Sequence, residues 1–138
     1  MRTEQIQLVE STWVYVAKIE EQAADLFYGK LFELDPSVKP LFRGDLREQG
    51  QKLMAVIGAA VSGLRQPETL RPTLRDLGRR HAGYGVTDAD YDSVGAALLW
   101  TLERGLGWRF TPDVRAAWAS AYGLLTGVMK AAARATAA

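Results

Sequence analysis

Residues 67–85, PETLRPTLRDLGRRHAGYG, contain the pattern that decides the fold of this chain. Apolar residues recur there in steps of four and three, and the series closes on a histidine: Leu70, Leu74, Leu77 and His81. This spacing predicts an amphipathic helix ending near Ala82, because the run AGYG at 82–85 is typical of a helix stop and a turn. His81 is the only histidine of the chain, and the pattern places its imidazole on the apolar face.

The other segments also follow the helical period, and none shows the alternation of a strand. Capping residues or a proline in the first turn mark several helix starts: Thr3, Asp35-Pro36, Thr87 and Thr111-Pro112-Asp113. We expect helices over about 3–16, 19–34, 36–42, 46–64, 67–82, 87–102 and 112–129, with short ones around Pro36 and Pro72. The predicted fold class is all-α, with about seven helices in a single domain spanning residues 1–138.

Length and composition narrow the functional classes. The 138 residues suffice for one hydrophobic core, and 48% apolar with 24% charged residues is ordinary globular usage. A net charge of +1 provides no strong field for nucleic acid or an anionic membrane, so we expect neither as a partner. The absence of cysteine excludes disulfides, thiolate zinc sites and iron–sulfur clusters. No signal peptide or membrane-spanning run is evident, and we expect a cytoplasmic protein.

Three polar side chains fall among apolar ones, and each allows two interpretations. Taken alone, His81 is more commonly a core histidine satisfied by hydrogen bonds than an axial metal ligand, although imidazole suits iron. Gln49, one turn before Leu53, is either a helix-edge side chain that reaches solvent or an amide donor to a ligand on iron. Tyr28 is either a core residue or a ligand contact, and a buried tyrosine usually needs a partner for its hydroxyl.

Conventional catalytic motifs are missing. Ser-His-Asp catalysis would rest on His81 alone, and the sequence has no nucleophile elbow. A zinc site with ordinary ligands is nearly excluded. The arginines at 71, 75, 79 and 80 form either a solvated helix face or a group that neutralises the carboxylates of a bound cofactor.

Motifs along nearly the whole chain resemble the globin family. They are Pro36, Leu41-Phe42, Gln49-x-x-Lys52-Leu53, Leu77-Gly-Arg-Arg-His81, Tyr84-Gly-Val86 and Phe110-Thr-Pro…Ala116-Ala-Trp118…Tyr122-Gly. The pattern is most similar to single-domain bacterial globins of the Hell's Gate and neuroglobin-like type, and next to the globin domains of flavohaemoglobins. The resemblance implies a three-over-three helical sandwich around a haem pocket, with haem b as cofactor.

The resemblance also implies roles by position. His81 matches the proximal iron ligand, and Phe42 matches the phenylalanine that stacks against haem. The distal positions, which face the gas ligand, fall on Tyr28, Gln49 and Leu53. Lys52 and Arg80 lie where haem propionates are often bound, and apolar porphyrin contacts match Leu77, Val86, Val94 and Leu98. Tyr91 matches a tyrosine that supports the proximal histidine in flavohaemoglobins.

A distal tyrosine and glutamine would make the protein a tight O2 binder. Bound O2 has partial superoxide character, so two donors worth roughly 1.5 kcal/mol each would slow its release about a hundredfold. We expect O2, NO and CO as ligands, and nitric oxide dioxygenation if an external reductase supplies electrons. An O2 carrier, store or sensor is the alternative, and a helical domain without haem is a third. We expect a monomer or a weak homo-oligomer.

Two departures from the family bear on chemistry. The chain has no second histidine, so the iron cannot be held by two histidines of one subunit. The glutamate that partners the proximal tyrosine in flavohaemoglobins is replaced, because that position falls on Ala135. Without this carboxylate His81 should donate less electron density to iron.

Overall fold

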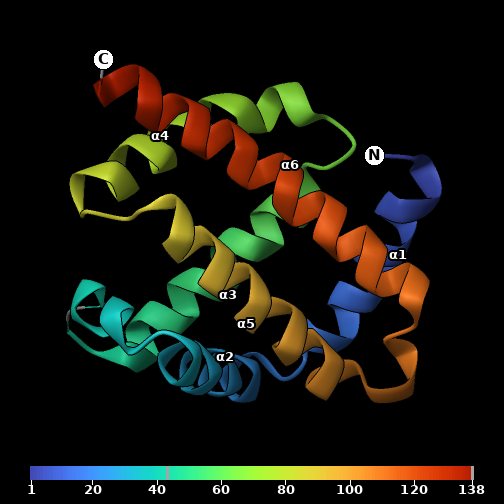
Figure 1. The fold of residues 1–138 in the computed structure, drawn as a ribbon. Helices are drawn as coiled ribbons and strands as arrows, with labels where there is room; N and C mark the ends of the chain where they lie inside the picture. Colours follow the sequence, from blue (N-terminus) through green and yellow to red (C-terminus); the bar gives the residue numbers. More distant parts are fainter. Residues whose placement is uncertain (43, 138) are drawn as a thin grey trace.

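The computed structural model describes residues 1–42 and 44–137, and this part of the chain is almost entirely helical (Figure 1). Six α-helices follow one another: α1 (Thr3–Ala17), α2 (Glu20–Leu34), α3 (Leu46–Ser62), α4 (Pro67–Gly83), α5 (Asp88–Leu106) and α6 (Pro112–Ala137). Two 3₁₀ segments, η1 (Pro36–Leu41) and η2 (Gly107–Arg109), connect α2 to α3 and α5 to α6. The all-α prediction is confirmed. None of these helices has the length and apolar character that a membrane span requires.

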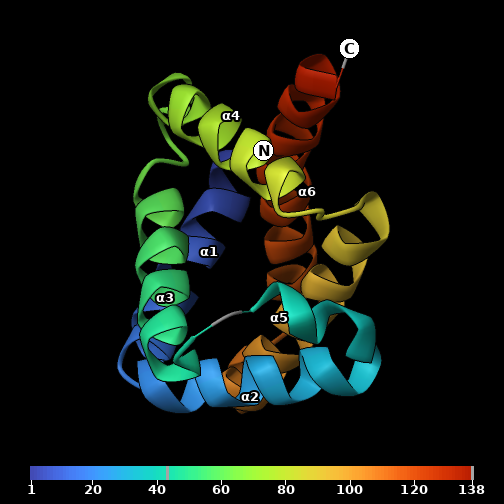
Figure 2. The ribbon, with the colours of Figure 1, turned by 90° about the vertical axis from the view of Figure 1, so that its left-hand side faces the viewer.

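The helices form two layers, with α1, α3 and α4 packed against α2, α5 and α6. Helices α1 and α4 both lie on α6, while α2 packs on α3 and α5. In Figure 2, α2 runs along the bottom, α3 rises on the left and α4 crosses the top toward α6. Helix α4 has α6 as its one extensive packing partner among the described elements and does not pack along α3. This arrangement confirms the predicted three-over-three sandwich.

The largest buried cluster joins α1 to α5 and α6. Val9, Leu102 and Ala117 are almost completely buried in it. Trp118 is the largest side chain of this cluster, and its indole Nε1 donates a hydrogen bond to Thr12 Oγ1 at 2.9 Å. Because both polar atoms are buried and paired, this core is complete without any further group.

Two helix crossings depend on glycine. A Cβ on Gly78 of α4 would lie 2.2 Å from the carbonyl oxygen of Met129 in α6. A Cβ on Gly50 of α3 would lie 2.9 Å from the Cβ of Ala24 in α2. Since real Cβ atoms do not approach other atoms so closely, these glycines let α4 settle on α6 and α3 settle on α2.

Most of the predicted helix starts are present. The Thr87 hydroxyl accepts from the N–H of Asp90 at 3.2 Å, and the Thr111 hydroxyl accepts from the N–H of Val114 at 3.2 Å. The prediction for Thr3 was wrong by one residue, because the N-cap is Arg2, whose N–H donates to the Gln5 side chain at 3.2 Å.

The bounds predicted for the helix around Pro72, 67–82, are right within one residue, but the expectation that this helix is short was wrong. Pro72 lies inside α4, which continues for 17 residues. Proline lacks an N–H and removes one helical hydrogen bond, but it lies near the start of the helix. We infer that the packing of Leu74 and Gly78 against α6 outweighs this loss.

Candidate cofactor-binding site

His81 lies in the last turn of α4, half-buried, with its Nδ1 2.7 Å from the carbonyl oxygen of Leu77. A carbonyl oxygen only accepts hydrogen bonds, so Nδ1 must carry the proton in this contact. In the neutral ring the lone pair is then on Nε2, the nitrogen on the far side from the helix. The helix thus fixes both the tautomer and the orientation that a metal ligand needs.

Tyr91, in the first turns of α5, lies next to His81 on the same side of the site. The two ring centroids are 6.3 Å apart and their planes differ by 22°. The backbone carbonyl of Tyr91 accepts a 2.6 Å hydrogen bond from the Tyr122 hydroxyl, which ties α5 to α6. The hydroxyl of Tyr91 itself is buried without a hydrogen-bond partner in the described part of the chain. Burial, reinforced by the negative charge of Asp88, raises the pKa of Tyr91 and keeps it protonated.

Four aromatic rings form a wall on the other side of the site. Tyr28 and Phe42 meet edge to face with centroids 5.3 Å apart, and Phe27 contacts Tyr28 in the same manner at 5.3 Å. Phe32 completes the group, 6.0 Å from Tyr28 and 5.6 Å from Phe42. These contacts hold η1 against α2 and fix the Phe42 ring at the end of η1.

The Tyr28 side chain is buried but no described residue accepts a hydrogen bond from its hydroxyl. Desolvation by burial raises the pKa of Tyr28 to about 12. The hydroxyl is therefore protonated at neutral pH and can act as a donor.

Helix α3 brings Gln49 and Leu53 to the same region. Gly50 allows α3 to approach α2 closely, and its missing side chain would stand 3.6 Å from the Tyr28 ring. Leu53 packs with the aromatic group of Phe42, and Gln49 is half-buried. Tyr28, Phe42 and Leu53 thus lie in one apolar cluster, and Gln49 lies one helical turn before Leu53.

The two cations that were predicted to bind the haem propionates, Lys52 and Arg80, lie at the surface. Lys52 pairs with Glu48 one turn earlier in α3, at 3.8 Å. Arg80 pairs with Asp76, one turn earlier in α4. Both cations are on the helices that carry Leu53 and His81, and each is exposed.

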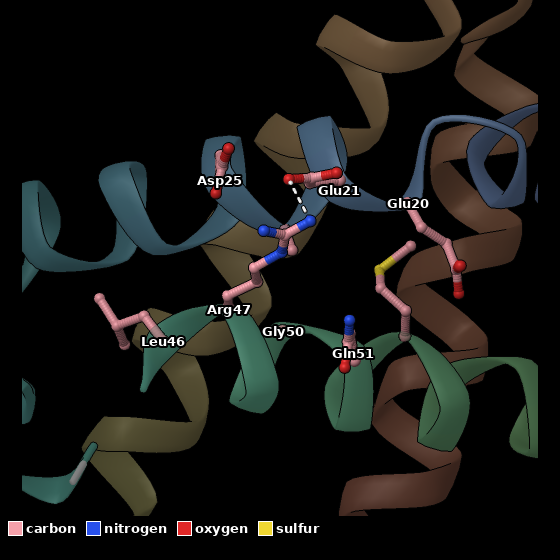
Figure 3. Close-up of a pocket in the computed structure, with 9 residues that line it drawn as sticks. Glu20, Glu21, Asp25, Leu46, Arg47, Gly50 and Gln51 are labelled. Carbon is pink, nitrogen blue, oxygen red and sulfur yellow. Dashed lines mark ion pairs between the residues drawn. The ribbon is translucent and has the colours of Figure 1, made fainter. Parts of the chain in front are cut away.

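A surface hollow between α2 and α3 lies apart from these residues. A cavity of about 150 Å³ lies between α2 and the start of α3, with Glu20, Asp25 and Gln51 at its rim (Figure 3). Arg47 crosses it to Glu21 at 3.4 Å. None of the predicted cofactor contacts lines this hollow, and the described residues hold no cluster of three His, Cys, Asp or Glu for a metal. It is a charged groove and not the predicted site.

Comparisons with known proteins decide the family. A family model described as Globin matches residues 25–129. The chain belongs to the globin family. It is 33% identical over 136 residues to neuroglobin from Danio rerio, covering 88% of this chain and 86% of that protein. Neuroglobin from Chaenocephalus aceratus is 31% identical over 137 residues, with coverage of 89% and 86%. The fold matches a bacterial globin from Campylobacter jejuni with a TM-score of 0.86 at 25% identity, covering 99% of each chain.

Membership of this family implies a haem-binding protein whose ligands are gases such as O2, and the site fits haem. Every apolar side chain expected on the porphyrin is half-buried, as is His81: Phe42, Leu53, Leu77, Val86, Val94 and Leu98. They divide between two clusters that share no member, Phe42 and Leu53 in one and Leu77 and Val86 in the other. A flat apolar group between the clusters would cover this surface, and α3 and α4 do not pack together there.

Some features of the site were not predicted from the sequence. Phe32 belongs to the aromatic wall. The only indication of this in the sequence is that Phe32 lies one turn after Tyr28. Asp35 accepts a hydrogen bond from Ser93 of α5 at 3.1 Å and so links the start of η1 to α5. A contact between residues 58 positions apart leaves no local pattern in the sequence.

Proposed function

We propose that this globin binds haem b through His81, holds O2 tightly on the ferrous iron, and acts as a nitric oxide dioxygenase when a separate reductase supplies electrons. We also propose that residues 1–138 form a single cytoplasmic domain, monomeric or weakly self-associating. When bound, haem supplies reversible O2 coordination and the reaction of that O2 with NO, which yields nitrate and ferric iron.

The chain's own residues would hold and orient the cofactor. The Nδ1 contact of His81 with Leu77 leaves Nε2 as the nitrogen for iron. Phe42 would stack on the porphyrin because its ring is already fixed by Tyr28 and Phe32. Lys52 and Arg80 would exchange their present carboxylate partners for haem propionates.

The observation that carries the tight-binding proposal is the Tyr28 hydroxyl. The Tyr28 side chain is buried, its hydroxyl is protonated because the pKa is about 12, and no acceptor pairs with that hydroxyl among the described residues. A ligand with partial negative charge would provide that acceptor, and O2 on ferrous iron carries more such charge than CO. Gln49 would supply the second donor, with Leu53 excluding water.

Replacement of Tyr28 by Phe tests this directly. We expect the O2 dissociation rate to rise about tenfold for the loss of one hydrogen bond of roughly 1.5 kcal/mol, with CO dissociation almost unchanged. Gln49→Leu should raise the O2 rate further, and Tyr15→Phe, on the exposed side of α1, is the matched control. An O2 dissociation rate that neither Tyr28→Phe nor Gln49→Leu changes would contradict the proposed donors.

Turnover separates the enzyme from an O2 carrier, store or sensor. With a reductase and its electron source present, a dioxygenase consumes many equivalents of NO per haem and forms nitrate. Consumption that stops after one equivalent, despite re-reduction of the iron, would assign the protein to the carrier class.

A further inference from the structure

Three arginines lie one turn apart on the exposed face of α4. Arg71, Arg75 and Arg79 are all exposed, and no carboxylate of the described residues forms an ion pair with any of them. Four other arginines form ion pairs: Arg47 with Glu21, Arg65 with Glu10, Arg80 with Asp76 and Arg134 with Asp88. Among the remaining described arginines, Arg104 and Arg109 lie over aromatic rings, and Arg2 and Arg115 are single cations that are not part of a row. We name Arg71, Arg75 and Arg79 the arginine row.

The arginine row concentrates the positive charge of the protein. Helix α4 contains four arginines against Glu68 and Asp76, a net charge of +2, whereas the whole chain has +1. The rest of the chain therefore carries −1. An approaching anionic surface would be attracted toward α4 and turned so that it meets this helix first.

The fold does not account for the arginine row. Helix α4 packs on α6 through Leu74 and Gly78, and the arginines project away from its apolar stripe. Like charges one turn apart destabilise a helix, by about 0.2–0.5 kcal/mol for each pair. Three unpaired arginines at this spacing are thus a cost to stability.

The position of the row connects it to the proposed iron ligand. His81 is on the same helix, two residues after Arg79, and Arg71 lies about 15 Å from His81 along the helix axis. A partner that docks on the row would lie behind the histidine, on the side of α4 away from the gas ligand.

We infer that the arginine row is the docking surface for an acidic protein that donates single electrons. The inference rests on the proposed function, which leaves ferric iron after each reaction with NO. One electron leaves the donor, a reduced flavoprotein or other one-electron carrier, and converts ferric to ferrous iron, with no atom exchanged. The side chains of α4 include no exposed large apolar residue to enter a membrane, and the net negative remainder of the chain disfavours an extended polyanion such as nucleic acid.

Charge reversal of the row provides the test. The haem-loaded wild type is mixed with a reduced, acidic flavodoxin in a stopped-flow instrument, and the rate of iron reduction is followed at increasing ionic strength. We expect R71E/R75E/R79E to lower the second-order rate at low salt by about ten- to a hundredfold and to flatten its salt dependence. R71Q/R75Q/R79Q should lower the second-order rate by an intermediate amount. This variant replaces the glutamate variant in the test if the latter folds poorly.

A matched control changes the same amount of charge elsewhere. K18E/R104E/R115E alters three exposed cations toward the other end of α6 and should lower the rate less than about threefold. Equal losses in the row and control variants, or an unchanged rate in the row variants, would overturn the inference. So would tight binding of the wild type to anionic vesicles or duplex DNA that depends on the row while reduction by flavodoxin does not.

Measurements on the same samples distinguish failure of the docking surface from failure of the proposed function. Row variants with normal O2 spectra and an unchanged reduction rate contradict the docking surface alone. A wild-type chain that takes up no haem contradicts the proposed function, and the docking inference with it.

Discussion

The core between α1, α5 and α6 and the site between α3 and α4 are built differently. In the core, Trp118 and Thr12 are buried and their polar atoms pair with each other. In the site, the apolar side chains are half-buried, the Tyr91 hydroxyl is buried with no partner among the described residues, and α4 does not pack along α3. The polar atoms of the core are therefore satisfied within the protein, whereas the site has half-buried apolar surface and an unpaired hydroxyl that a further group could cover.

The largest expected effect comes from filling the α4–α6 crossing. Gly78→Ala places a Cβ against the backbone of Met129 and must push α4 off α6. We expect a loss of about 2–4 kcal/mol in the free energy of unfolding, measured by urea denaturation, together with weaker haem retention because His81 moves with α4. Gly29→Ala, in α2 with no atom near its Cβ, is the control and should be neutral or stabilising. Equal stability of the two variants would show that the crossing is not tight.

A change in the core should separate stability from cofactor binding. Trp118→Phe removes the hydrogen bond to Thr12 and part of a buried ring, and we expect a loss of about 1–3 kcal/mol in unfolding free energy. Haem affinity of the folded protein should stay within about threefold. Trp108→Phe, at a side chain that is 82% exposed, should change neither quantity. A large fall in haem affinity with Trp118→Phe would mean that the two regions are not independent.

Two tyrosines form a matched pair on the proximal side. Tyr122→Phe removes a hydroxyl that donates to the backbone of Tyr91, and should cost about 1 kcal/mol. Tyr91→Phe removes a hydroxyl that has no partner in residues 1–42 and 44–137, so the apo protein should be equally stable or up to about 1 kcal/mol more stable. Thermal unfolding of both apo variants measures the difference. A clear loss with Tyr91→Phe would show that its hydroxyl has a partner in solution.

The smallest effect concerns acid stability at η1. Hydrogen bonds from Ser37, and then from Ser93, hold the pKa of Asp35 below its ordinary value. A carboxyl group with a lowered folded pKa stabilises the protein above its unfolded pKa, and that contribution is lost as the pH falls through the folded pKa. Asp35→Asn should therefore make the melting temperature slightly less dependent on pH below about pH 4. An identical pH profile for the variant and the wild type would contradict this role.

The sequence predicted the helices and missed what depends on close approach, while the roles of the site residues stay predictions. The series from Leu70 to His81 and the caps at Thr87 and Thr111 are local patterns, so they could be found in one sequence. The shape of the site depends on contacts across the chain, such as Gly78 against Met129 and Ser93 against Asp35. Pro72 was misleading because the low helix propensity of proline indicated a short helix. Tertiary packing against α6 instead sustains a helix of 17 residues.

Haem titration of wild type and His81→Gly tests the central claim most directly. For the wild type we predict saturation at one haem per chain and a Soret band that shifts with CO. His81→Gly should lose haem on gel filtration or bind it without the proximal ligand, and added imidazole should restore the wild-type spectrum. A His81→Gly protein that keeps haem with unchanged spectra and no response to imidazole would contradict the assignment of His81 as the iron ligand.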